Sequence, residues 1–389
     1  MKVAIIGGGA AGLFCAANIS VHEVTVFEGT SSCGNKLMLT GGGRCNYTNK
    51  STSFFDGIIC GSKFARSCIT NFGQKDLIKW FELKGLETVF EKDRAFPSTK
   101  KAADVRNLLL EECKKNNVKF FYNTKITSVG KNGDGFVVCG KTYDAVIVAT
   151  GGKTFPKTGS DGSGNLILSK LGVETKDFEP KLGPIYAKGT KVLQGVSANV
   201  GLKLLQNKKV IAKTEGPIVF THFGISGPAA LDCSGIACGK PDYIAIDFLP
   251  EISMEELKKR VLNEKQSKTL VKNFVSRFVA KAIAEQIEEK CGFFGKRLCD
   301  LTNKQIENFC FICKNYFFEF LHFSDFGESW VCSGGANLSN INPKNMETKN
   351  IKNLFIIGEQ LDMFGLCGGF NLQLAFSSAM AVAAYLEEI

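Results

Sequence analysis

The amino-acid sequence predicts an α/β protein whose sheet is built from both ends of the chain and is interrupted by an insert. Three observations predict this class. Residues 1–28 have the order strand, glycine-rich turn, helix, strand. Strand-like and glycine-rich segments return after Gly327 and lead into a last helix, expected at about Leu372–Glu388. Residues 181–327 differ from both in composition, so we expect them to form a separate part of the fold.

The opening segment is the clearest part of this pattern. Val3–Ile6 is a short apolar run of strand character, Leu13–Ser20 is helical in period, and Val24–Phe27 is a second apolar strand. Two strands joined by a helix form a crossover unit, in which the strands are parallel. The order therefore predicts a parallel sheet.

The residues between these elements predict a dinucleotide site. Gly7 permits a tight turn from strand to helix, Gly9 lets the backbone approach a pyrophosphate, and Gly12 lets helix and strand pack closely. The N–H groups at the start of the helix then face the phosphates. Glu28 ends the second strand, where an acid can accept both hydroxyls of an adenosine ribose. By itself this pattern fits FAD and NAD equally.

Composition sets further bounds. The chain has 389 residues, enough for two or three domains, and a formal net charge of +10, a mild indication of a polyanionic partner. Its 15 cysteines have no regular spacing and its start does not resemble a signal peptide, so we expect reduced thiols and a cytoplasmic protein. The uncharged stretch Met363–Leu386 contains Asn371, Gln373 and glycines, so we expect a buried loop and helix and no membrane span.

A second glycine-rich segment lies between Ser31 and Asn49. It has the sequence Thr40-Gly41-Gly42-Gly43-Arg44-Cys45-Asn46. Three consecutive glycines followed by a cation predict backbone close to a ligand, with Arg44 near an anionic or electron-rich group. The alternative is a flexible surface turn.

Residues 62–152 alternate between helical and strand patterns. Ser62–Leu83 and Ala102–Asn116 are helical in period, and Asn132-Gly133 stands where a hairpin turn is expected. The predicted strands are Val118–Phe121, Lys125–Val129, Gly135–Cys139 and Thr142–Ala149. The last of them runs into Thr150-Gly151-Gly152, where glycines again allow the backbone to meet a ligand at a strand's carboxyl end.

The composition changes near Lys181. From there to Thr214 the chain has seven lysines and no acid. We expect a small β subdomain with strands at Val200–Leu205, Val210–Lys213, Ile218–Thr221 and Tyr243–Phe248. Ser253 and Glu256 form a capping-box pattern, which opens a helical region expected to continue, with interruptions, to about Phe323.

With these motifs in view, the chain resembles the HI0933-like flavoproteins, the family of the BaiN and YhiN proteins, over nearly its whole length. Six motifs recur in order. The turn Gly7–Gly12 with Glu28 is the first, and Lys36–Asn49 is a signature of high specificity. The others are Arg94–Pro97 with Lys101–Val105, Ala149–Gly152, Thr221–Pro228, and Gly358–Asp362 followed by Gly368–Gln373.

The resemblance implies a Rossmann-like FAD-binding domain of the GxGxxG type, split by an insert with a β-barrel-like and an all-α subdomain. The expected bounds are 1–180 with 328–389 for the FAD-binding domain, 181–250 for the barrel-like part and 251–327 for the helical part. They agree with the change of composition at both ends of the insert.

The resemblance also implies which residues hold a non-covalent FAD. Those at the pyrophosphate and adenosine are Gly7, Gly9, Ala10, Ala11, Gly12, Glu28, Gly29 and Ile126, with Thr150 and Gly151 passing near the cofactor. Those along the flavin are Asn35, Lys36, Gly42, Gly43, Arg44, Cys45 and Asn46. Those at the ribityl chain and the isoalloxazine edge are Gly358, Glu359, Asp362, Gly369, Phe370, Asn371 and Leu372. Family members often have arginine where this chain has Asn35, which weakens that one contact.

A flavin of this kind suggests a chemistry. For an alkene conjugated to a carbonyl, hydride from flavin N5 would reach the β-carbon, while an acid protonates the α-carbon and cations or N–H groups steady the enolate. Arg44 is the candidate for the electrostatic role, or it merely anchors the flavin or its loop. Cys45 is a candidate proton donor, or a small loop filler. His222 is a third catalytic candidate, whereas we expect His22 and His322 to be structural.

The resemblance implies two kinds of substrate: steroid-like enones, and uridine in ribosomal RNA, which would become dihydrouridine. The net charge and the lysine-rich stretch 181–214 favour RNA slightly. Alternatives are a small-molecule oxidase of the amino-ketone type and a non-catalytic dinucleotide-binding module. The loops Gly41–Asn46 and Gly368–Gln373 argue against the module, because a protein that holds only ADP has no use for them.

Several other patterns exclude more than they predict. No second GxGxxG exists for NAD(P)H, so a nicotinamide would bind transiently against the flavin, or the reductant is another compound. Cys310 and Cys313 have metal or redox spacing without a second pair, and we expect no metal site. Cys233 and Cys238 lie in the insert, where a disulfide reductase would not have them. The oligomeric state does not follow from the sequence.

Overall fold

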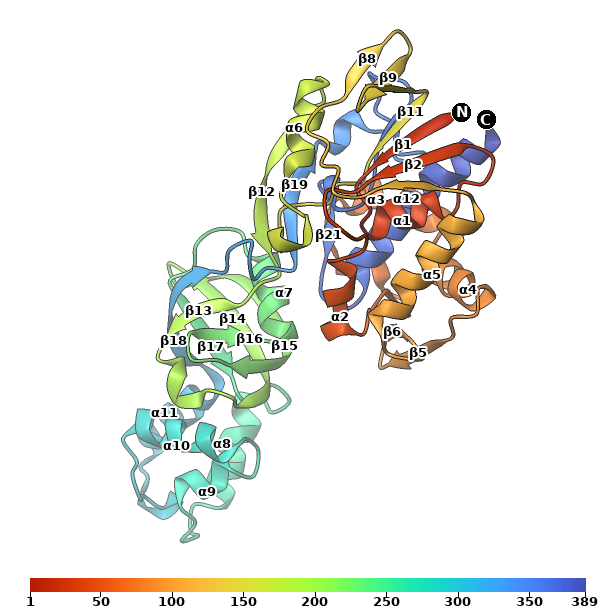
Figure 1. The fold of residues 1–389 in the computed structure, drawn as a ribbon. Helices are drawn as coiled ribbons and strands as arrows, with labels where there is room; N and C mark the ends of the chain where they lie inside the picture. Colours follow the sequence, from red (N-terminus) through yellow and green to blue (C-terminus); the bar gives the residue numbers. More distant parts are fainter. The chain divides into compact units, whose positions relative to one another are not determined.

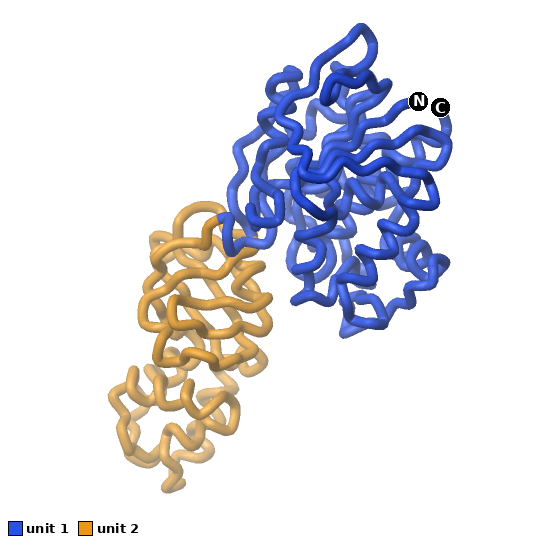
Figure 2. The backbone as a smooth tube through the Cα atoms, viewed as in Figure 1, with its two compact units in different colours: residues 1–181, 326–389 blue, residues 182–325 orange.

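The computed structural model describes all 389 residues, and the chain divides into two compact units. Unit 1 consists of Met1–Lys181 and Phe326–Ile389, and unit 2 of Leu182–Asp325 (Figure 2). Each unit has its own buried apolar cluster. Unit 2 is therefore an insertion into a domain that the two ends of the chain complete.

Unit 1 is built on a five-stranded parallel sheet in the order β20-β11-β1-β2-β7. The strands are β1 (Lys2–Ile6), β2 (Glu23–Phe27), β7 (Lys119–Phe121), β11 (Ala145–Val148) and β20 (Leu354–Ile356). Strands β1 and β11 are apolar throughout their buried residues because elements cover both faces of the sheet. The edge strand β20 comes from the C-terminal part of the chain, as predicted.

Helices cover this sheet, and α1 packs against α5 and α12 (Figure 1). The helices of unit 1 are α1 (Ala10–Ala16), α2 (Thr40–Gly43), α3 (Ser62–Asn71), α4 (Gln74–Leu83), α5 (Ala102–Lys115), α6 (Ser163–Lys170) and α12 (Phe370–Glu388). Both termini lie at the same end of unit 1. None of the helices in the protein combines the length and the apolar character that a membrane span requires.

Small antiparallel sheets complete unit 1. They pair β8 (Gly130–Asn132), β9 (Gly135–Val138) and β10 (Lys141–Tyr143); β12 (Thr175–Lys181) and β19 (Val331–Ala336); β4 (Ile58–Cys60) and β21 (Phe364–Gly365); and β3 (Thr48–Asn49), β5 (Thr88–Glu91) and β6 (Arg94–Pro97). The hairpin turn predicted at Asn132-Gly133 is confirmed, because β8 and β9 pair on either side of it.

Four predicted elements of unit 1 differ. The helix expected at Leu13–Ser20 is α1, which begins at Ala10 and ends at Ala16. The helix expected at Ser62–Leu83 breaks into α3 and α4, because Gly73 begins a new helix and its N–H donates to Asp76 Oδ2 at 2.9 Å. The strand expected at Lys125–Val129 is wrong: this segment has no regular structure. The strand expected at Thr142–Ala149 is two strands, since β10 pairs with β9 and β11 joins the parallel sheet.

Unit 2 contains a closed antiparallel barrel in the order β13-β16-β15-β14-β17-β18. Its strands are β13 (Ile185–Lys188), β14 (Ser197–Gln206), β15 (Lys209–Phe220), β16 (Gly224–Ser226), β17 (Tyr243–Asp247) and β18 (Tyr316–Phe323). Helix α7 (Pro228–Ile236) packs against β15. Four further helices are α8 (Met254–Asn263), α9 (Val271–Val275), α10 (Lys281–Cys291) and α11 (Asn303–Lys314).

The insert differs from the prediction in two places. The helical region expected to reach Phe323 ends at α11, and residues 316–323 form β18 instead, which closes the barrel between β13 and β17. The helical part expected at 251–327 therefore contains a barrel strand. The runs Val210–Lys213 and Ile218–Thr221 lie in or at the end of one long strand, β15. Half of the capping box predicted at Ser253 is confirmed, since its hydroxyl accepts from Glu256 N–H at 3.1 Å, whereas the Glu256 side chain accepts from Arg260 Nε at 2.9 Å. The α/β fold class with a barrel insert is confirmed.

Candidate functional site

The glycine turn between β1 and α1 contains two kinds of glycine. Gly7 has a φ of +107°, and a Cβ there would lie 2.4 Å from the carbonyl oxygen of Ala149. A Cβ on Gly12 would lie 2.0 Å from the carbonyl oxygen of Gly7. Gly9 differs, because its φ is −76° and a Cβ there would meet no atom within 4 Å. Neither conformation nor packing requires glycine at Gly9, whose backbone borders open space.

Glu28 lies at the carboxyl end of β2, against this turn. It is buried, and its Oε2 accepts from Gly8 N–H at 2.9 Å. Its Oε1 accepts from the N–H of Thr30 at 2.8 Å and from its hydroxyl at 2.7 Å. No lysine or arginine forms an ion pair with it, so hydrogen bonds alone hold this buried carboxylate.

Several residues predicted to contact the cofactor lie near Glu28, among them Asn35, which was expected along the flavin and lies instead in the loop that holds Glu28. Asn35 donates to the hydroxyl of Thr30 at 2.9 Å, so it belongs to the same loop network and not to a free contact surface. Gly29 lies beside Lys125, and Ile126 is buried in the irregular segment that follows. Thr124 N–H donates to the carbonyl of Glu28 at 2.8 Å, which brings that segment to the end of β2. Ala10 and Ala11 lie in the first turn of α1.

Ser160 is a residue that the sequence analysis missed. It is buried, and its hydroxyl has no hydrogen-bond partner. A Cβ on Gly151 would lie 3.3 Å from this hydroxyl, and a Cβ on Gly159 would lie 3.7 Å from Glu28 Oε1. Ser160 therefore lies between the Thr150-Gly151 segment and Glu28. A buried hydroxyl left unpaired costs roughly 1–3 kcal/mol, which a ligand atom at this point would relieve.

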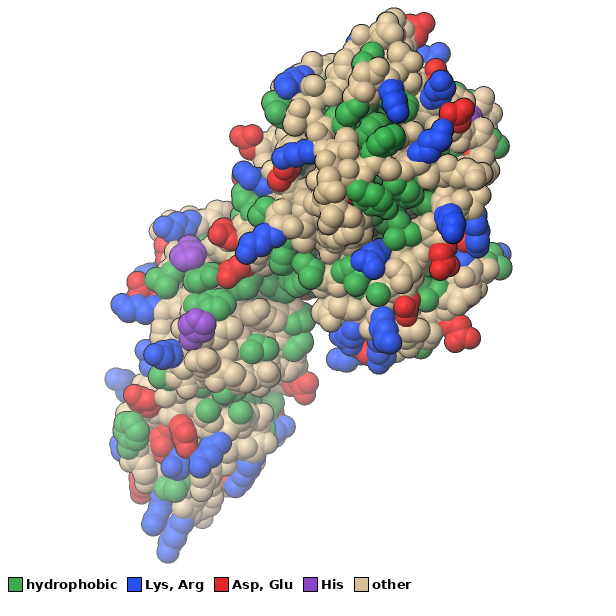
Figure 3. Space-filling view, in the orientation of Figure 1, with side chains coloured by type: hydrophobic (Ala, Val, Ile, Leu, Met, Phe, Trp, Pro, Cys, Tyr) green, Lys and Arg blue, Asp and Glu red, His purple; other side chains and the backbone are tan.

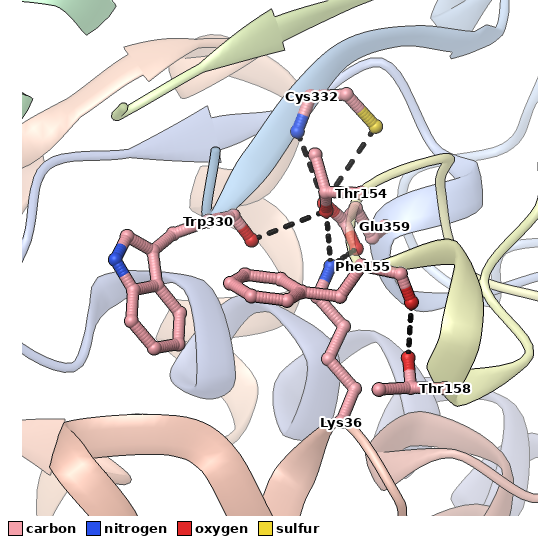
Figure 4. Close-up of polar contacts among 7 residues, drawn as sticks. All are labelled: Lys36, Thr154, Phe155, Thr158, Trp330, Cys332 and Glu359. Atoms are coloured by element: carbon pink, nitrogen blue, oxygen red, sulfur yellow. Dashed lines mark hydrogen bonds and ion pairs between the residues drawn. The ribbon is translucent and has the colours of Figure 1, made fainter. Parts of the chain in front are cut away.

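Lys36 and Glu359 come from opposite ends of the chain and pair with each other. Lys36 Nζ donates to Glu359 Oε2 at 2.8 Å and to the hydroxyl of Thr154 at 2.5 Å (Figure 4). Glu359 Oε1 accepts from Cys332 N–H at 3.0 Å. Burial and the nearby Glu359 raise the pKa of the Cys332 thiol, so it stays protonated. The contacts tie the loop after β2, the loop after β11, strand β19 and the turn after β20 together.

An aromatic pair lies beside this cluster. The rings of Phe155 and Trp330 are 4.9 Å apart, and both are half-buried (Figure 4). Phe155 has a φ of +51°, a strained value for a residue with a large side chain. Nothing in the sequence pattern predicted this pair.

Asp362 serves a different junction. Its Oδ2 accepts from Lys176 Nζ at 2.7 Å, and its Oδ1 accepts from Gly334 N–H at 2.8 Å. Burial opposes ionisation, but these donors outweigh it and hold the pKa of Asp362 below its ordinary value. Both carboxylate oxygens thus have protein partners, which join β12 and β19 to the segment after Gly358.

Arg44 is anchored to its own neighbourhood. Its Nε donates to Gly41 O at 3.1 Å, a terminal nitrogen donates to Glu91 Oε2 at 2.9 Å, and its guanidinium lies 4.7 Å from the ring of Phe96. These contacts correspond to the anchoring alternative of the sequence analysis. Cys45 is fully buried, and burial raises its pKa to about 12. Such a thiol is a poor acid without access to solvent, so the structure does not favour it as a proton donor.

The two predicted flavin-side loops meet. With its amide oriented to satisfy its neighbours, Asn46 donates to Thr48 O at 2.8 Å and accepts from Gly369 N–H at 3.1 Å. Gly42 and Gly43 have φ of +67° and +82°, and a Cβ on Gly42 would meet nothing within 4 Å. The 41–46 loop therefore presents open backbone, as Gly9 does.

The remaining residues of the C-terminal loop hold its shape. Phe370 packs 4.8 Å from the ring of Phe54, and Asn371 accepts from Gly365 N–H and donates to its carbonyl, both at 2.9 Å. Leu372 is half-buried. Gly358 has a φ of +67° and lies against Ala11, so the two glycine turns are in contact.

His222 belongs to unit 2. It is exposed on the turn between β15 and β16, with its ring 5.0 Å from that of Phe223, and histidine side chains reach the surface of unit 2 in Figure 3. That it lines the reaction site stays a prediction. The other two histidines contact the fold around them: His22 contacts the N-terminus and Leu386 O, and His322 stacks on Tyr186 at 4.2 Å. Their structural roles stay predictions.

The cysteines form neither a disulfide nor a metal-binding cluster. All 15 are free, and no group of three or more histidine, cysteine or acidic side chains is arranged to hold a metal ion. Cys310 and Cys313 are buried within α11. Burial raises the pKa of Cys310 to about 11 and that of Cys313 well above its ordinary value, so both behave as core residues.

The chain is similar to known proteins over nearly its whole length. The model of the HI0933-like protein Rossmann domain matches residues 1–385. The chain is 28% identical to the 3-dehydro-bile acid delta(4,6)-reductase of Clostridium scindens, with 97% of each chain covered. It is 29% identical to the ribosomal RNA dihydrouridine synthase of Haemophilus influenzae and 27% identical to that of Escherichia coli, each covering 97% of this chain and 96% of the relative.

Among solved structures, the open conformation of a flavocytochrome c3 fumarate reductase superposes with a TM-score of 0.51 at 13% identity. The match covers 100% of this chain and 78% of that one. At this identity the likeness shows the fold alone, and it agrees with a Rossmann-type domain.

Proposed function

The chain belongs to the HI0933-like family of flavoprotein oxidoreductases, as its motifs predict, and we propose that it is an FAD-dependent reductase of a conjugated C=C bond. The observation that carries the proposal is the open backbone at Gly9 and Gly42, which neither packing nor, at Gly9, conformation explains. The orphaned hydroxyl of Ser160 beside Gly151 supports it independently.

The residues present fit FAD. The Gly7–Gly12 turn would hold the pyrophosphate, with Glu28 at the adenosine ribose. The joined loops at Asn46 and Gly369 would border the isoalloxazine ring. When bound, FAD supplies hydride transfer to and from a carbon atom, chemistry that no side chain of the protein offers.

The protein itself would hold the cofactor-binding loops in place and supply a proton. We call the segments around the proposed cofactor site, which carry Lys36, Thr154, Cys332 and Glu359, the cradle. The Lys36–Glu359 pair joins its loops, because Lys36 also donates to Thr154 and Glu359 also accepts from Cys332 N–H. Arg44 holds the glycine loop through Gly41 and Glu91. Of the three catalytic candidates, Arg44 is anchored and Cys45 is buried, and we propose His222, whose side chain is exposed, as the donor.

The substrate that we propose is a uridine in ribosomal RNA, whose 5,6 double bond is conjugated to a carbonyl. The relatives from Haemophilus influenzae and Escherichia coli carry that activity in their names, and the bile-acid relative is as similar. The net charge of +10 and the acid-free stretch 181–214 favour the polyanionic substrate over a steroid-like enone. A nicotinamide is proposed as a transient reductant, since the chain has a single GxGxxG turn.

The test uses the purified protein and a deletion strain. We expect a visible flavin spectrum after mild purification, and a loss of dihydrouridine from ribosomal RNA in the strain, restored by the wild-type gene and not by Gly9→Val. Reduction of a steroid enone with unchanged dihydrouridine would overturn the RNA substrate and leave the reductase. Oxygen-dependent oxidation of an amino-ketone without either reduction would replace the reductase by the oxidase. Absence of flavin would remove the proposal altogether.

A further inference from the structure

The β14–β15 hairpin carries lysines on the outside of the barrel. In β14, Val200, Leu202 and Leu204 are fully buried. Because side chains alternate along a strand, Lys203 lies on the outer face. Lys213 of β15 stands directly opposite Lys203 in the strand register and is exposed. Lys208 and Lys209 are exposed at the hairpin turn.

These lysines have no acidic partners. None of Lys203, Lys208, Lys209 and Lys213 forms an ion pair, and Ser197–Thr214 contains no acid. Like charges directly opposite each other destabilise a sheet. Other lysines of the same stretch are paired: Lys188 with Glu319 at 3.6 Å and Lys181 with Glu179 at 3.3 Å. The barrel therefore keeps a local excess of positive charge that its own stability does not require.

The acids near the hairpin limit this charge without neutralising it. Glu215 follows Lys213 by two residues and opposes Gly201, so it marks one end of the basic row. Asp242 accepts from Asn207 N–H at 2.6 Å and is thereby committed to the turn. Glu319 opposes Tyr243 in the register, and Lys188 pairs with it.

An exposed aromatic ring lies beside the lysines. Tyr243 of β17 is 52% exposed and stands opposite Leu205 of β14. On the other side of Leu205 stands Val210 of β15, which is also 52% exposed. Basic side chains next to an exposed aromatic ring match the two parts of single-stranded nucleic acid, since the lysines meet phosphates and the ring stacks on a base.

We infer that the hairpin surface, defined as Lys203, Lys208, Lys209, Lys213 and Tyr243, binds a single-stranded segment of RNA. The inference rests on the proposed ribosomal RNA substrate and adds where the protein holds it. An acidic protein surface would need the lysines and not the ring, so the tyrosine is what separates the two kinds of partner.

The test measures binding of the full FAD-loaded protein to a fluorescent single-stranded RNA over a salt series. The variant K208A/K209A/K213A should weaken binding at low salt and reduce the slope of log affinity against log salt by about two, since each phosphate contact on a single strand contributes roughly 0.7. Lys258→Ala is the control, because it removes a partly exposed lysine of unit 2 that is paired with Glu307 and lies outside the hairpin surface; its binding should equal that of the wild type.

Tyr243→Leu tests the ring. We expect about tenfold weaker RNA binding, from the loss of one stacked base, and unchanged binding of inorganic polyphosphate, which has no bases. Equal RNA binding by the wild type and the triple variant would overturn the hairpin surface. Unchanged RNA binding by Tyr243→Leu would overturn the single-stranded contact and leave a contact by charge alone.

The outcomes separate this inference from the substrate proposal. If dihydrouridine forms normally and the hairpin variants bind RNA as the wild type does, only the proposed RNA-binding surface is overturned. Hairpin-dependent RNA binding by a protein that reduces enones and forms no dihydrouridine supports the surface and overturns the substrate. Circular dichroism of each variant confirms that the barrel is folded.

Discussion

Three cations of unit 1 each reach an acid, Lys36 at 2.8 Å, Lys176 at 2.7 Å and Arg44 at 2.9 Å, whereas the lysines of the β14–β15 hairpin in unit 2 reach none. In unit 1 the pairs join segments that are far apart in sequence, such as Lys36 and Glu359. Charge there fixes the loops of the cradle. In the hairpin, charge remains available for a partner. The figures show basic side chains at the surface of both units, so position alone does not distinguish the two uses (Figure 3).

The comparison predicts that backbone space, and not charge, decides cofactor binding in unit 1. Gly9→Val should weaken FAD binding by at least about 100-fold, because the new side chain fills the space beside the turn. The fold should persist, since a Cβ at this position meets no protein atom within 4 Å. Flavin titration and thermal unfolding measure the two effects. Gly130→Val, on an open edge strand, is the control, and a variant of Gly9 that still binds FAD tightly would contradict the assignment.

Breaking a cradle ion pair should cost more than breaking a surface pair. Lys36→Met removes the lysine that donates to Glu359 Oε2 and to the Thr154 hydroxyl, and we expect a loss of about 1–2 kcal/mol in the free energy of unfolding, moderated by partial exposure. Lys100→Met removes the more exposed partner of Glu91 and should cost less than Lys36→Met, because this pair is open to solvent. Urea unfolding compares them. Equal losses would mean that the Lys36 pair has no special role in the cradle.

Ser160→Ala should weaken FAD binding about fivefold, the value of one hydrogen bond of roughly 1 kcal/mol. The apoprotein should keep or slightly gain stability, because the change removes a buried hydroxyl that has no protein partner. Ser169→Ala, on the exposed side of α6, is the control. If Ser160→Ala lowers apoprotein stability and leaves FAD affinity unchanged, the hydroxyl has a structural partner and not a ligand.

The smallest effect concerns pH. Asp362 has a pKa below its ordinary value, so its contribution to stability is present above the pKa of an unfolded aspartate, about 3.9, and is lost as pH falls through its folded value. Lys176→Met should therefore lower stability by about 0.5–1 kcal/mol near neutral pH and by progressively less below pH about 4. Unfolding by urea at several pH values tests this. A difference that does not change with pH would assign the effect to packing by the lysine stem.

By itself, the sequence determined the parts of the protein that depend on neighbouring residues. The turn at Gly7–Gly12, the hairpin at Asn132-Gly133 and the cap at Ser253 follow from local conformation and short-range hydrogen bonds. The change of composition near Lys181 lies where the chain divides into its two compact units. Tertiary structure decided the rest. Residues 316–323 are a strand because the barrel has a gap between β13 and β17, a condition that no local pattern contains.

The charged residues of the cradle show the same limit. Lys36 and Glu359 were both expected along the cofactor, but only the fold brings them together across 323 positions and satisfies each with the other. The sequence could not identify Ser160, because whether a buried hydroxyl lacks a hydrogen-bond partner depends on the residues that the fold places around it. Local propensity acts over a few residues, whereas pairing and burial depend on contacts between distant segments, and these formed only when the sheet assembled.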